Sequence, residues 1–356
     1  MFKRVPPLLL GFLMTALLLE LLLHALPVST GYDFGLVDAD HPIVHGTARF
    51  RYTYSKDWNF HLANSGVLNN YGFRSAYDYV PDDRAVAVIG NSFIQADALT
   101  PSDTVTQRLG SLLRRPTYAL GIDGASLADY LATAQWAATT FKARTLILLL
   151  TTGDLSHSCL PRLGGHYLDA ANGSMTLALI DRPAQSRFKA LVNESKLFRY
   201  VYDNLRAAAN WSRGWQGAQD NDDRPANPAG LAALLGCTNS RFADTATQFL
   251  LHSFHQLEID HAVHIIFALA PGYRREQLVA AGALRDVDLF ARRAAAEGFQ
   301  VVPLDGAFSA ALRAQYRLDF LPIDGHWNAV AHALAAQTIA TAMSIQGAAP
   351  GLHQPD

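Results

Sequence analysis

The sequence predicts an α/β protein, a three-layer α/β/α sandwich with a mainly parallel central sheet, preceded by one N-terminal transmembrane helix. Two observations predict the sandwich. Short apolar runs rich in β-branched residues alternate with segments of helical periodicity, and three of these runs end in loops that contain glycine. A third observation, a long apolar stretch near the N-terminus, predicts the membrane helix.

The stretch from Leu8 to Leu26 is apolar almost throughout and, as a helix, is long enough to cross a bilayer. Lys3 and Arg4 precede it, which predicts that residues 1–7 stay in the cytoplasm and that the rest of the chain lies outside. A cleaved signal peptide is the alternative. Because Pro27-Val28-Ser29 makes a poor cleavage site, we favour the uncleaved anchor over residues 8–26.

The composition is typical of a folded domain without a charged binding surface. Of the 356 residues, 50 % are hydrophobic, enough to bury a full core. A net charge of −2 with 17 % charged residues argues against nucleic-acid partners. No glycine-rich nucleotide-binding motif and no Cys-x-x-Cys pair occurs, so we expect neither a cofactor nor a metal ion. In an exported protein, Cys159 and Cys237 are expected to form a disulfide.

Residues 27–80 form a β-leaning lead-in to the sandwich. Its alternating run from Ala48 to Ser55 predicts a strand, and Asn69 to Arg74 brings the lead-in to a turn. The sandwich itself is predicted over residues 81–345. Its strands are expected at 85–89, 117–120, 145–150, 264–269 and 300–303, and its helices at 103–113, 127–140, 245–258, 286–297 and 329–344.

The alternation of strands and helices is lost at about residues 158–236, which we interpret as an insertion or lid that selects the substrate. Within it we expect a hairpin over 167–180 that turns at Asn172-Gly173, a helix over 191–208 and a polar loop over 211–227. Residues 346–356 are expected to be a tail.

Three side chains have the types and positions that nucleophilic acyl transfer needs. Ser92 follows the buried run Ala85 to Phe93, at the edge of the sheet where open α/β sheets bind ligands. His326, with Asp324 two residues before it, lies ahead of the last helix. The set offers a nucleophile, a base and a carboxylate that orients the base. The structural alternatives are a plain turn at Ser92 and a helix cap at Asp324.

In these residues the chain resembles the SGNH (GDSL-type) hydrolase superfamily, particularly its membrane-anchored bacterial members linked to modification of surface polysaccharides. Gly90-Asn91-Ser92-Phe93 matches the first block, Asn69 to Arg74 a phrase of the anchored members, and Asp324-Gly325-His326 the last block. The resemblance implies that Gly124 matches the glycine whose N–H helps hold the oxyanion.

The same resemblance implies an SGNH/flavodoxin-like sheet, no cofactor, and a single-pass protein of the bacterial inner membrane whose catalytic domain faces the periplasm or cell exterior. The expected partners are the membrane, an acylated carbohydrate or other ester substrate, and other membrane proteins of a polysaccharide-modification system. A flavodoxin-like nucleotide binder has the same topology, but the missing phosphate-binding motif counts against it.

Two departures from the family pattern bear on the oxyanion hole. Asn91 replaces the usual aspartate beside the serine, and Thr152-Gly153-Asp154 stands where Gly-Asn-Asp is usual. The side-chain amide that completes the hole is therefore missing, and losing one such donor costs about a hundred- to a thousandfold in turnover. Either Thr152 or Asn91 substitutes for it, or the enzyme is slow, or catalysis is lost.

The sequence therefore supports two functions. The first is a serine esterase or O-acyltransferase that acts on acylated carbohydrate outside the cytoplasmic membrane through an acyl-enzyme on Ser92, with His326 as base and Asp324 as its orienting carboxylate. The second is a catalytically weak polysaccharide-binding or assembly subunit that retains the fold. The altered third block favours the second, and the order of the other blocks favours the first.

Overall fold

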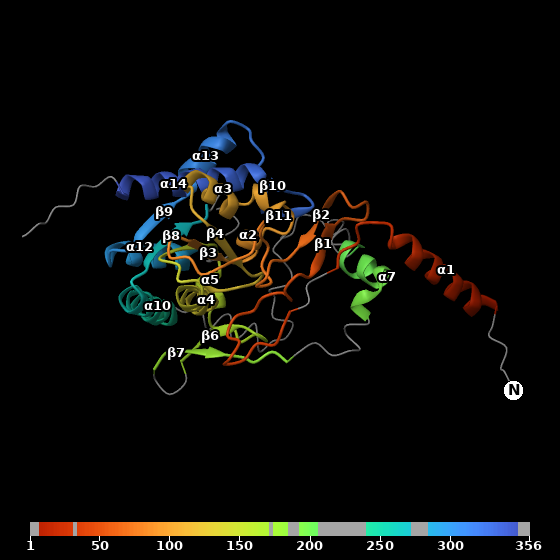
Figure 1. Ribbon diagram of the computed structural model, residues 1–356, viewed down its shortest axis with the longest axis horizontal. Helices are drawn as coiled ribbons and strands as arrows, with labels where there is room; N and C mark the ends of the chain where they lie inside the picture. Colours follow the sequence, from red (N-terminus) through yellow and green to blue (C-terminus); the bar gives the residue numbers. More distant parts are fainter. Residues whose placement is uncertain are drawn as a thin grey trace, which may run out of the picture.

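The computed structural model describes residues 7–30, 34–170, 174–183, 192–205, 240–271 and 284–347. Its centre is a five-stranded sheet in which every neighbouring pair is parallel, in the order β4-β3-β5-β8-β9. The strands are β3 (Val86–Gly90), β4 (Thr117–Gly121), β5 (Thr145–Leu150), β8 (His264–Leu269) and β9 (Gln300–Pro303). This order confirms the predicted parallel α/β sheet, and each predicted strand is present (Figure 1).

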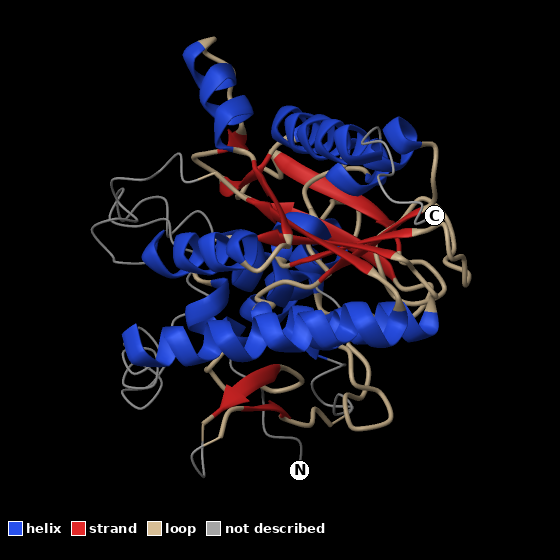
Figure 2. Ribbon diagram, turned by 90° about the vertical axis from the view of Figure 1, so that its left-hand side faces the viewer, coloured by secondary structure: helices blue, strands red, loops and turns tan. Residues whose placement is uncertain are grey.

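Helices cover both faces of the sheet, so the predicted three layers are confirmed (Figures 1 and 2). On β3, Ala87 and Ile89 join one apolar cluster while Val86 and Val88 join the other, because successive side chains of a strand point to opposite faces. The first cluster includes residues of α4 (Leu127–Thr140), α10 (Ser240–His261) and α12 (Leu284–Ala296). The second includes residues of α3 (Val105–Leu113), α13 (Asp305–Arg313) and α14 (Ala329–Gly347).

The strand order places a ligand site at the end of β3. From β3 the chain first adds β4 on one side and then returns to add β5 on the other. In sheets of this kind the loops that follow the strands diverge where the order reverses, and ligands bind in the crevice between them. Three short elements lie in these loops: α2 (Ser92–Gln95), η1 (Pro101–Asp103) and α5 (Asp154–His157).

The lead-in contains an antiparallel hairpin of β1 (Arg51–Lys56) and β2 (Leu62–Val67), in which Tyr54 is paired with Asn64. The turn that follows explains the Asn69 to Arg74 phrase. The Asn69 side chain accepts hydrogen bonds from the N–H groups of Tyr71 and Phe73, both at 3.0 Å, and so closes the turn. The phrase therefore presents Arg74 to the sandwich, where its side chain is buried.

The described part of the predicted insertion contains the expected hairpin, with β6 (His166–Asp169) antiparallel to β7 (Thr176–Leu179). The helix predicted over 191–208 is broken at Ser195 in its described part, where helical residues 192–194 precede α7 (Lys196–Arg199) and the π-helical η3 (Tyr200–Asn204). Asn172-Gly173, the loop over 211–227 and Cys237 lie outside the described residues. Cys159 is disulfide-bonded.

The N-terminal helix differs from its prediction. It spans α1 (Pro7–Leu23), because the chain turns after Leu23. In the described part of the chain no helix is long and apolar enough to cross a membrane, so the predicted transmembrane helix over 8–26 is not supported. Glu20 of α1 binds the start of α7 instead, accepting hydrogen bonds at 2.8 Å from the Ser195 hydroxyl and from two backbone N–H groups of α7.

The segment ahead of the last helix also differs from its prediction. The sequence predicts a loop at Asp324-Gly325-His326, whereas the structure has a short antiparallel pair, β10 (Asp319–Phe320) and β11 (Asp324–Trp327). A strand holds its backbone more firmly than a loop. Asp324 and His326, two residues apart on β11, therefore lie on one face of this strand.

Candidate active site

Ser92 is the first residue of α2, directly after β3. Asn91 caps this helix through its side-chain oxygen, which accepts a hydrogen bond from the Phe93 N–H at 3.1 Å. Gly90 is needed just before it, since a Cβ there would lie 2.5 Å from the Ile94 side chain. This sharp strand-to-helix turn presents the Ser92 hydroxyl at the carboxyl edge of the sheet.

The structure brings Ser92, His326 and Asp324 together as a continuous hydrogen-bonded chain. The Ser92 Oγ and the His326 Nε2 are 2.8 Å apart. The His326 Nδ1 lies 2.5 Å from the Asp324 Oδ1, which also accepts the His326 backbone N–H at 2.8 Å. Phe93 packs against the imidazole, with ring centres 5.2 Å apart. This is the geometry of a serine, a base and an orienting carboxylate.

Asp324 is held as an anion in spite of its burial. Burial alone would raise its pKa, but hydrogen bonds from His326 and Tyr54, with the nearby charges of His326 and Lys56, hold the pKa well below its usual range. An ionised Asp324 accepts the Nδ1 proton of His326. The Nε2 of the imidazole is then left to accept the proton of the Ser92 hydroxyl.

Tyr54 is a site residue that sequence reasoning missed. Its hydroxyl donates a short hydrogen bond to the Asp324 Oδ2, the oxygen that His326 does not use. Burial and the negative charge of Asp324 raise the pKa of Tyr54 well above its ordinary value, so the hydroxyl keeps its proton and acts as a donor. The alternating run around Tyr54 predicted a strand, but no sequence signal pointed to a partner so far along the chain.

Two backbone N–H groups lie where an oxyanion hole is expected. In the register of the sheet Gly90 is paired with Gly121, so the loops that carry Ser92 and Gly124 start from neighbouring positions, and Asp123, next to Gly124, lines the same pocket as Ser92. Among the described residues neither the Ser92 nor the Gly124 N–H has a hydrogen-bond acceptor. Gly124 has a φ of +69°, a conformation that favours glycine. This arrangement can donate to a developing oxyanion.

The Gly124 loop is fixed from two sides. On one side the buried Gln95 side chain accepts the Asp123 N–H at 2.6 Å. On the other, Asp129 accepts hydrogen bonds from the N–H of Ser126, at 2.8 Å, and from Arg162, also at 2.8 Å. The first contact holds the loop at Asp123, next to Gly124, and the second holds it at Ser126, two residues after Gly124.

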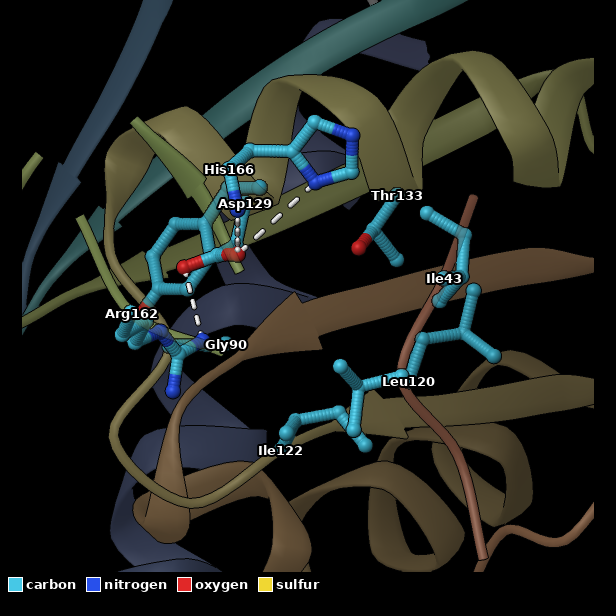
Figure 3. Close-up of a pocket in the computed structure, with 11 residues that line it drawn as sticks. Ile43, Gly90, Leu120, Ile122, Asp129, Thr133, Arg162 and His166 are labelled. Atoms are coloured by element: carbon cyan, nitrogen blue, oxygen red, sulfur yellow. Dashed lines mark hydrogen bonds and ion pairs between the residues drawn. The ribbon is translucent and has the colours of Figure 1, made fainter. Parts of the chain in front are cut away.

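Figure 3 shows the polar cluster behind this loop, where Arg162 and His166 converge on Asp129. Burial alone would raise the pKa of Asp129, but the charge of Arg162 and the hydrogen bonds from His166 and Ser126 lower it. Arg162 also donates to the Asp123 carbonyl oxygen at 3.4 Å. The cluster therefore connects the start of the insertion to the loop that carries Gly124.

The third block lies in a buried network that faces away from the reacting atoms. The Asn91 amide, one proposed substitute for the missing donor, donates to the Thr151 hydroxyl at 2.6 Å and to the Asp154 carboxyl at 3.1 Å. Asp154 also accepts from the Tyr130 hydroxyl at 3.0 Å. Burial outweighs these hydrogen bonds and raises the pKa of Asp154 to about 7. Asn91 and Asp154 thus support the turn from within.

Thr152 and Gly153 follow β5, and neither lines the pocket at Ser92. Gly153 has a φ of +93°, and a Cβ at this position would lie 3.1 Å from the ring of His157. The family that the sequence resembles has an asparagine at this position. Here the imidazole of His157 lies next to the point where such a side chain would start. The structure therefore brings Ser92, His326 and Asp324 together and leaves Thr152 and Gly153 outside the pocket.

The pocket at Ser92 has mixed walls. It is lined by Tyr54, Lys56, Ser92, Ala96, Asp97, Ala98, Leu99, Asp123, His326 and Trp327. Buried Arg74 shapes one wall, because its guanidinium donates to the Gln95 carbonyl at 2.7 Å and, more closely, to the carbonyls of Ala96 and Leu99. No group of three His, Cys, Asp or Glu side chains that could hold a metal ion occurs in the ranges that the structure describes.

No family model and no curated protein matches the chain. Solved structures to which it is similar include a member of the lipolytic G-D-S-L family from Veillonella parvula, at 9% identity and a TM-score of 0.38, covering 73% of this chain and 98% of that chain. Another is a catalytic mutant of an acetylxylan esterase from Geobacillus stearothermophilus, at 12% identity and a TM-score of 0.39, covering 74% and 95%. The chemistry of this site is accordingly judged from its own geometry.

Proposed function

We propose that this protein is a serine esterase or O-acyltransferase that acts on acylated carbohydrate through an acyl-enzyme on Ser92. The observation that carries the proposal is the chain from the Ser92 Oγ through His326 to Asp324, with distances of 2.8 and 2.5 Å. These are hydrogen-bonding distances for a nucleophile, its base and the orienting carboxylate.

The reaction proceeds in two halves. The Ser92 Oγ attacks the ester carbonyl while His326 Nε2 takes the hydroxyl proton, and the N–H groups of Ser92 and Gly124 donate to the oxyanion. Collapse of the tetrahedral intermediate breaks the ester C–O bond, and the leaving alcohol takes the proton from His326. Water or a sugar hydroxyl then attacks the acyl-enzyme by the reverse sequence, which gives hydrolysis or transfer.

Acylated carbohydrate is the substrate class that the resemblance in sequence motifs implies, and the pocket is chemically suited to it. The carboxylates of Asp97 and Asp123 and the ammonium of Lys56 line the pocket with Ser92, and such groups hydrogen-bond to sugar hydroxyls. Ala96, Ala98 and Leu99 offer apolar surface beside them for an acyl group. Hydrolysis and transfer differ only in the second acceptor, which is water in one and a sugar hydroxyl in the other.

Labelling with a serine-directed fluorophosphonate tests the proposal. The wild type is expected to react in a time-dependent manner, and Ser92→Ala to react at least about a hundredfold more slowly. Incubation with acetylated oligosaccharides, followed by mass, then separates release of acetate from transfer. If wild type and Ser92→Ala label at the same rate, the protein is not a serine esterase or transferase of this kind.

A catalytically weak polysaccharide-binding or assembly subunit is the second candidate. It is favoured by Gly153, which has no amide to complete the oxyanion hole, and by Asn91, whose amide donates into the buried network instead. This function predicts binding to a polysaccharide that is equal in wild type and Ser92→Ala, with no labelling of either.

We also propose that the protein works outside the cytoplasm. The disulfide at Cys159 supports this location, because such bonds persist in oxidising compartments. Fractionation of cells that express the whole chain provides the test. Recovery of the reduced protein from the cytoplasmic fraction alone would contradict the proposal.

A further inference from the structure

The two oxygens of Asp324 have different partners. Oδ1 accepts both the Nδ1 and the backbone N–H of His326, and Oδ2 accepts the hydroxyl of Tyr54. Asp324 is buried, with its side chain 4% exposed. An oxygen of a buried carboxylate that has no donor is costly, so the Tyr54 hydroxyl supplies what solvent would otherwise supply.

We propose that Tyr54 is a positioning residue that fixes the rotation of the Asp324 carboxylate, and through it the alignment of His326 with Ser92. This inference rests on the proposed esterase or transferase function and deepens it. Tyr54 makes its contact through Asp324, so its contribution to the reaction passes through the imidazole. The N-terminal lead-in would then contribute a residue that aligns the catalytic side chains.

The hairpin that carries Tyr54 is held on both of its strands. Asn64, the cross-strand partner of Tyr54, donates through its amide to the Asp97 carbonyl at 2.9 Å and to the Leu99 carbonyl at 2.6 Å. Ser55, on the other face of β1, accepts from the amide of Asn204 at 2.8 Å. These contacts hold Tyr54 in a defined position relative to the pocket.

The charged groups around this contact agree with a positioning role. Lys56 of the same strand and His326 bring positive charge to Asp324, and Asp97 and Asp123 bring negative charge toward Tyr54. The hydroxyl is therefore surrounded by groups that keep it protonated. Since it already donates to Asp324, a direct contact with substrate is not its main role.

Tyr54→Phe tests the proposal in the full chain, with the ester substrate for which wild type shows activity. We expect kcat to fall about 10- to 100-fold while KM changes by less than about twofold, the effect of losing a hydrogen bond to a charged group. Loss of the donor also raises the pKa of Asp324. The imidazole must be neutral to take the Ser92 proton, and a carboxylate without the Tyr54 donor favours the imidazolium form more strongly, so activity on acidification is lost at higher pH than in wild type.

Tyr118→Phe is the matched control. It removes another buried tyrosine's hydroxyl, whose hydrogen bond of 2.6 Å goes to the Val80 carbonyl near the amino end of β4. This variant is expected to keep the kcat and the pH profile of wild type. Thermal unfolding of both variants separates a loss of stability from a loss of alignment.

A double-mutant cycle with Asp324→Asn completes the test. If Tyr54 acts through Asp324, Tyr54→Phe has little further effect on kcat in the Asp324→Asn background. Multiplicative effects, a rise in KM alone, or an unchanged kcat and pH profile in Tyr54→Phe would each overturn the inference. The proposed function fails separately, if wild type shows no labelling or turnover that depends on Ser92.

Discussion

The loops after β3 and β5 are neighbours at the same edge of the sheet, yet they use their polar residues in opposite ways. The loop after β3 presents Ser92 to His326, and the site residues around it line a pocket. The loop after β5 directs Asp154 inward, where it binds Thr151, Asn91 and Tyr130. One loop presents the proposed nucleophile, and the other forms a buried network beside it.

This difference shows that position at a strand end does not by itself make a residue catalytic. Parallel strands bring their following loops together, but the first residues of each loop decide whether side chains point out or in. Directly after β3, helix α2 begins at Ser92 and turns its hydroxyl outward. After β5, Gly153 with a φ of +93° caps the start of α5, and the Asp154 carboxyl turns back to accept a hydrogen bond from the Thr151 N–H at 2.7 Å.

The largest expected effect comes from a comparison of two histidines, His326 next to Ser92 and His157 in the segment after β5. His326→Ala removes the base at Ser92, and kcat should fall by a factor of about a thousand or more. His157→Ala, beside Gly153, should lower kcat by less than about fivefold, since His157 does not line the pocket at Ser92. Steady-state kinetics on both variants provide the measurement. An equal loss in the two would mean that the loop after β5 also takes part in the reaction.

A second prediction uses the proton of the buried network. Burial raises the pKa of Asp154 from 3.8 to about 7, so the folded chain keeps a proton that the unfolded chain releases. The contribution of Asp154 to stability is therefore full below about pH 4 and is lost as the pH rises through about 7. Between pH 5 and 8 the free energy of unfolding should fall by on the order of 3 kcal/mol more in wild type than in Asp154→Asn.

Denaturant unfolding of both proteins at the two pH values gives this difference directly. If the free energy of unfolding changes equally between pH 5 and 8 in wild type and in Asp154→Asn, Asp154 is ionised throughout this range. Asp154 would then be an anion, as Asp324 is. The difference between the loops after β3 and β5 would be smaller than the structure indicates.

The sequence was informative where a local pattern determined the outcome. The strands β5, β8 and β9 start and end at the residues predicted, because buried parallel strands are continuous apolar runs with clear breaks. Ser92 and His326 were identifiable because each stands in a short motif at a strand end or before a helix. In the predicted helix over 191–208 the described part is short and irregular, and its apolar side chains Phe198, Val201 and Tyr202 are exposed, so packing against the core does not stabilise a longer helix there.

The residues that sequence reasoning missed act across long separations. Tyr54 and Asp324 are 270 positions apart, and no local pattern relates them. The amide of Asn91 has the chemistry of an oxyanion donor. Only the fold shows that this amide donates its hydrogen bonds to Thr151 and Asp154 instead. The direction of a side chain within a loop depends on partners brought in by the tertiary structure, which a single sequence does not reveal.

The smallest expected effect concerns the support of Gly124, the proposed oxyanion donor in the loop after β4. Arg162→Ala removes the hydrogen bonds to Asp129 and to the Asp123 carbonyl, so the support on the Asp129 side is weakened to the Ser126 N–H contact, while the Gln95 contact on the other side is unchanged. A looser loop holds the oxyanion less well, and we expect kcat to fall about tenfold with KM little changed.

Arg293→Ala is the matched control for this last variant, because it removes a comparable arginine–aspartate pair, with Asp244 at 2.6 Å, between α12 and α10. It should leave kcat within about twofold of wild type, since partly exposed pairs away from a site contribute little. If Arg162→Ala matches this control in both kcat and stability, Gln95 and the Ser126–Asp129 contact fix the Gly124 loop without Arg162. The start of the insertion then has no part in holding the oxyanion.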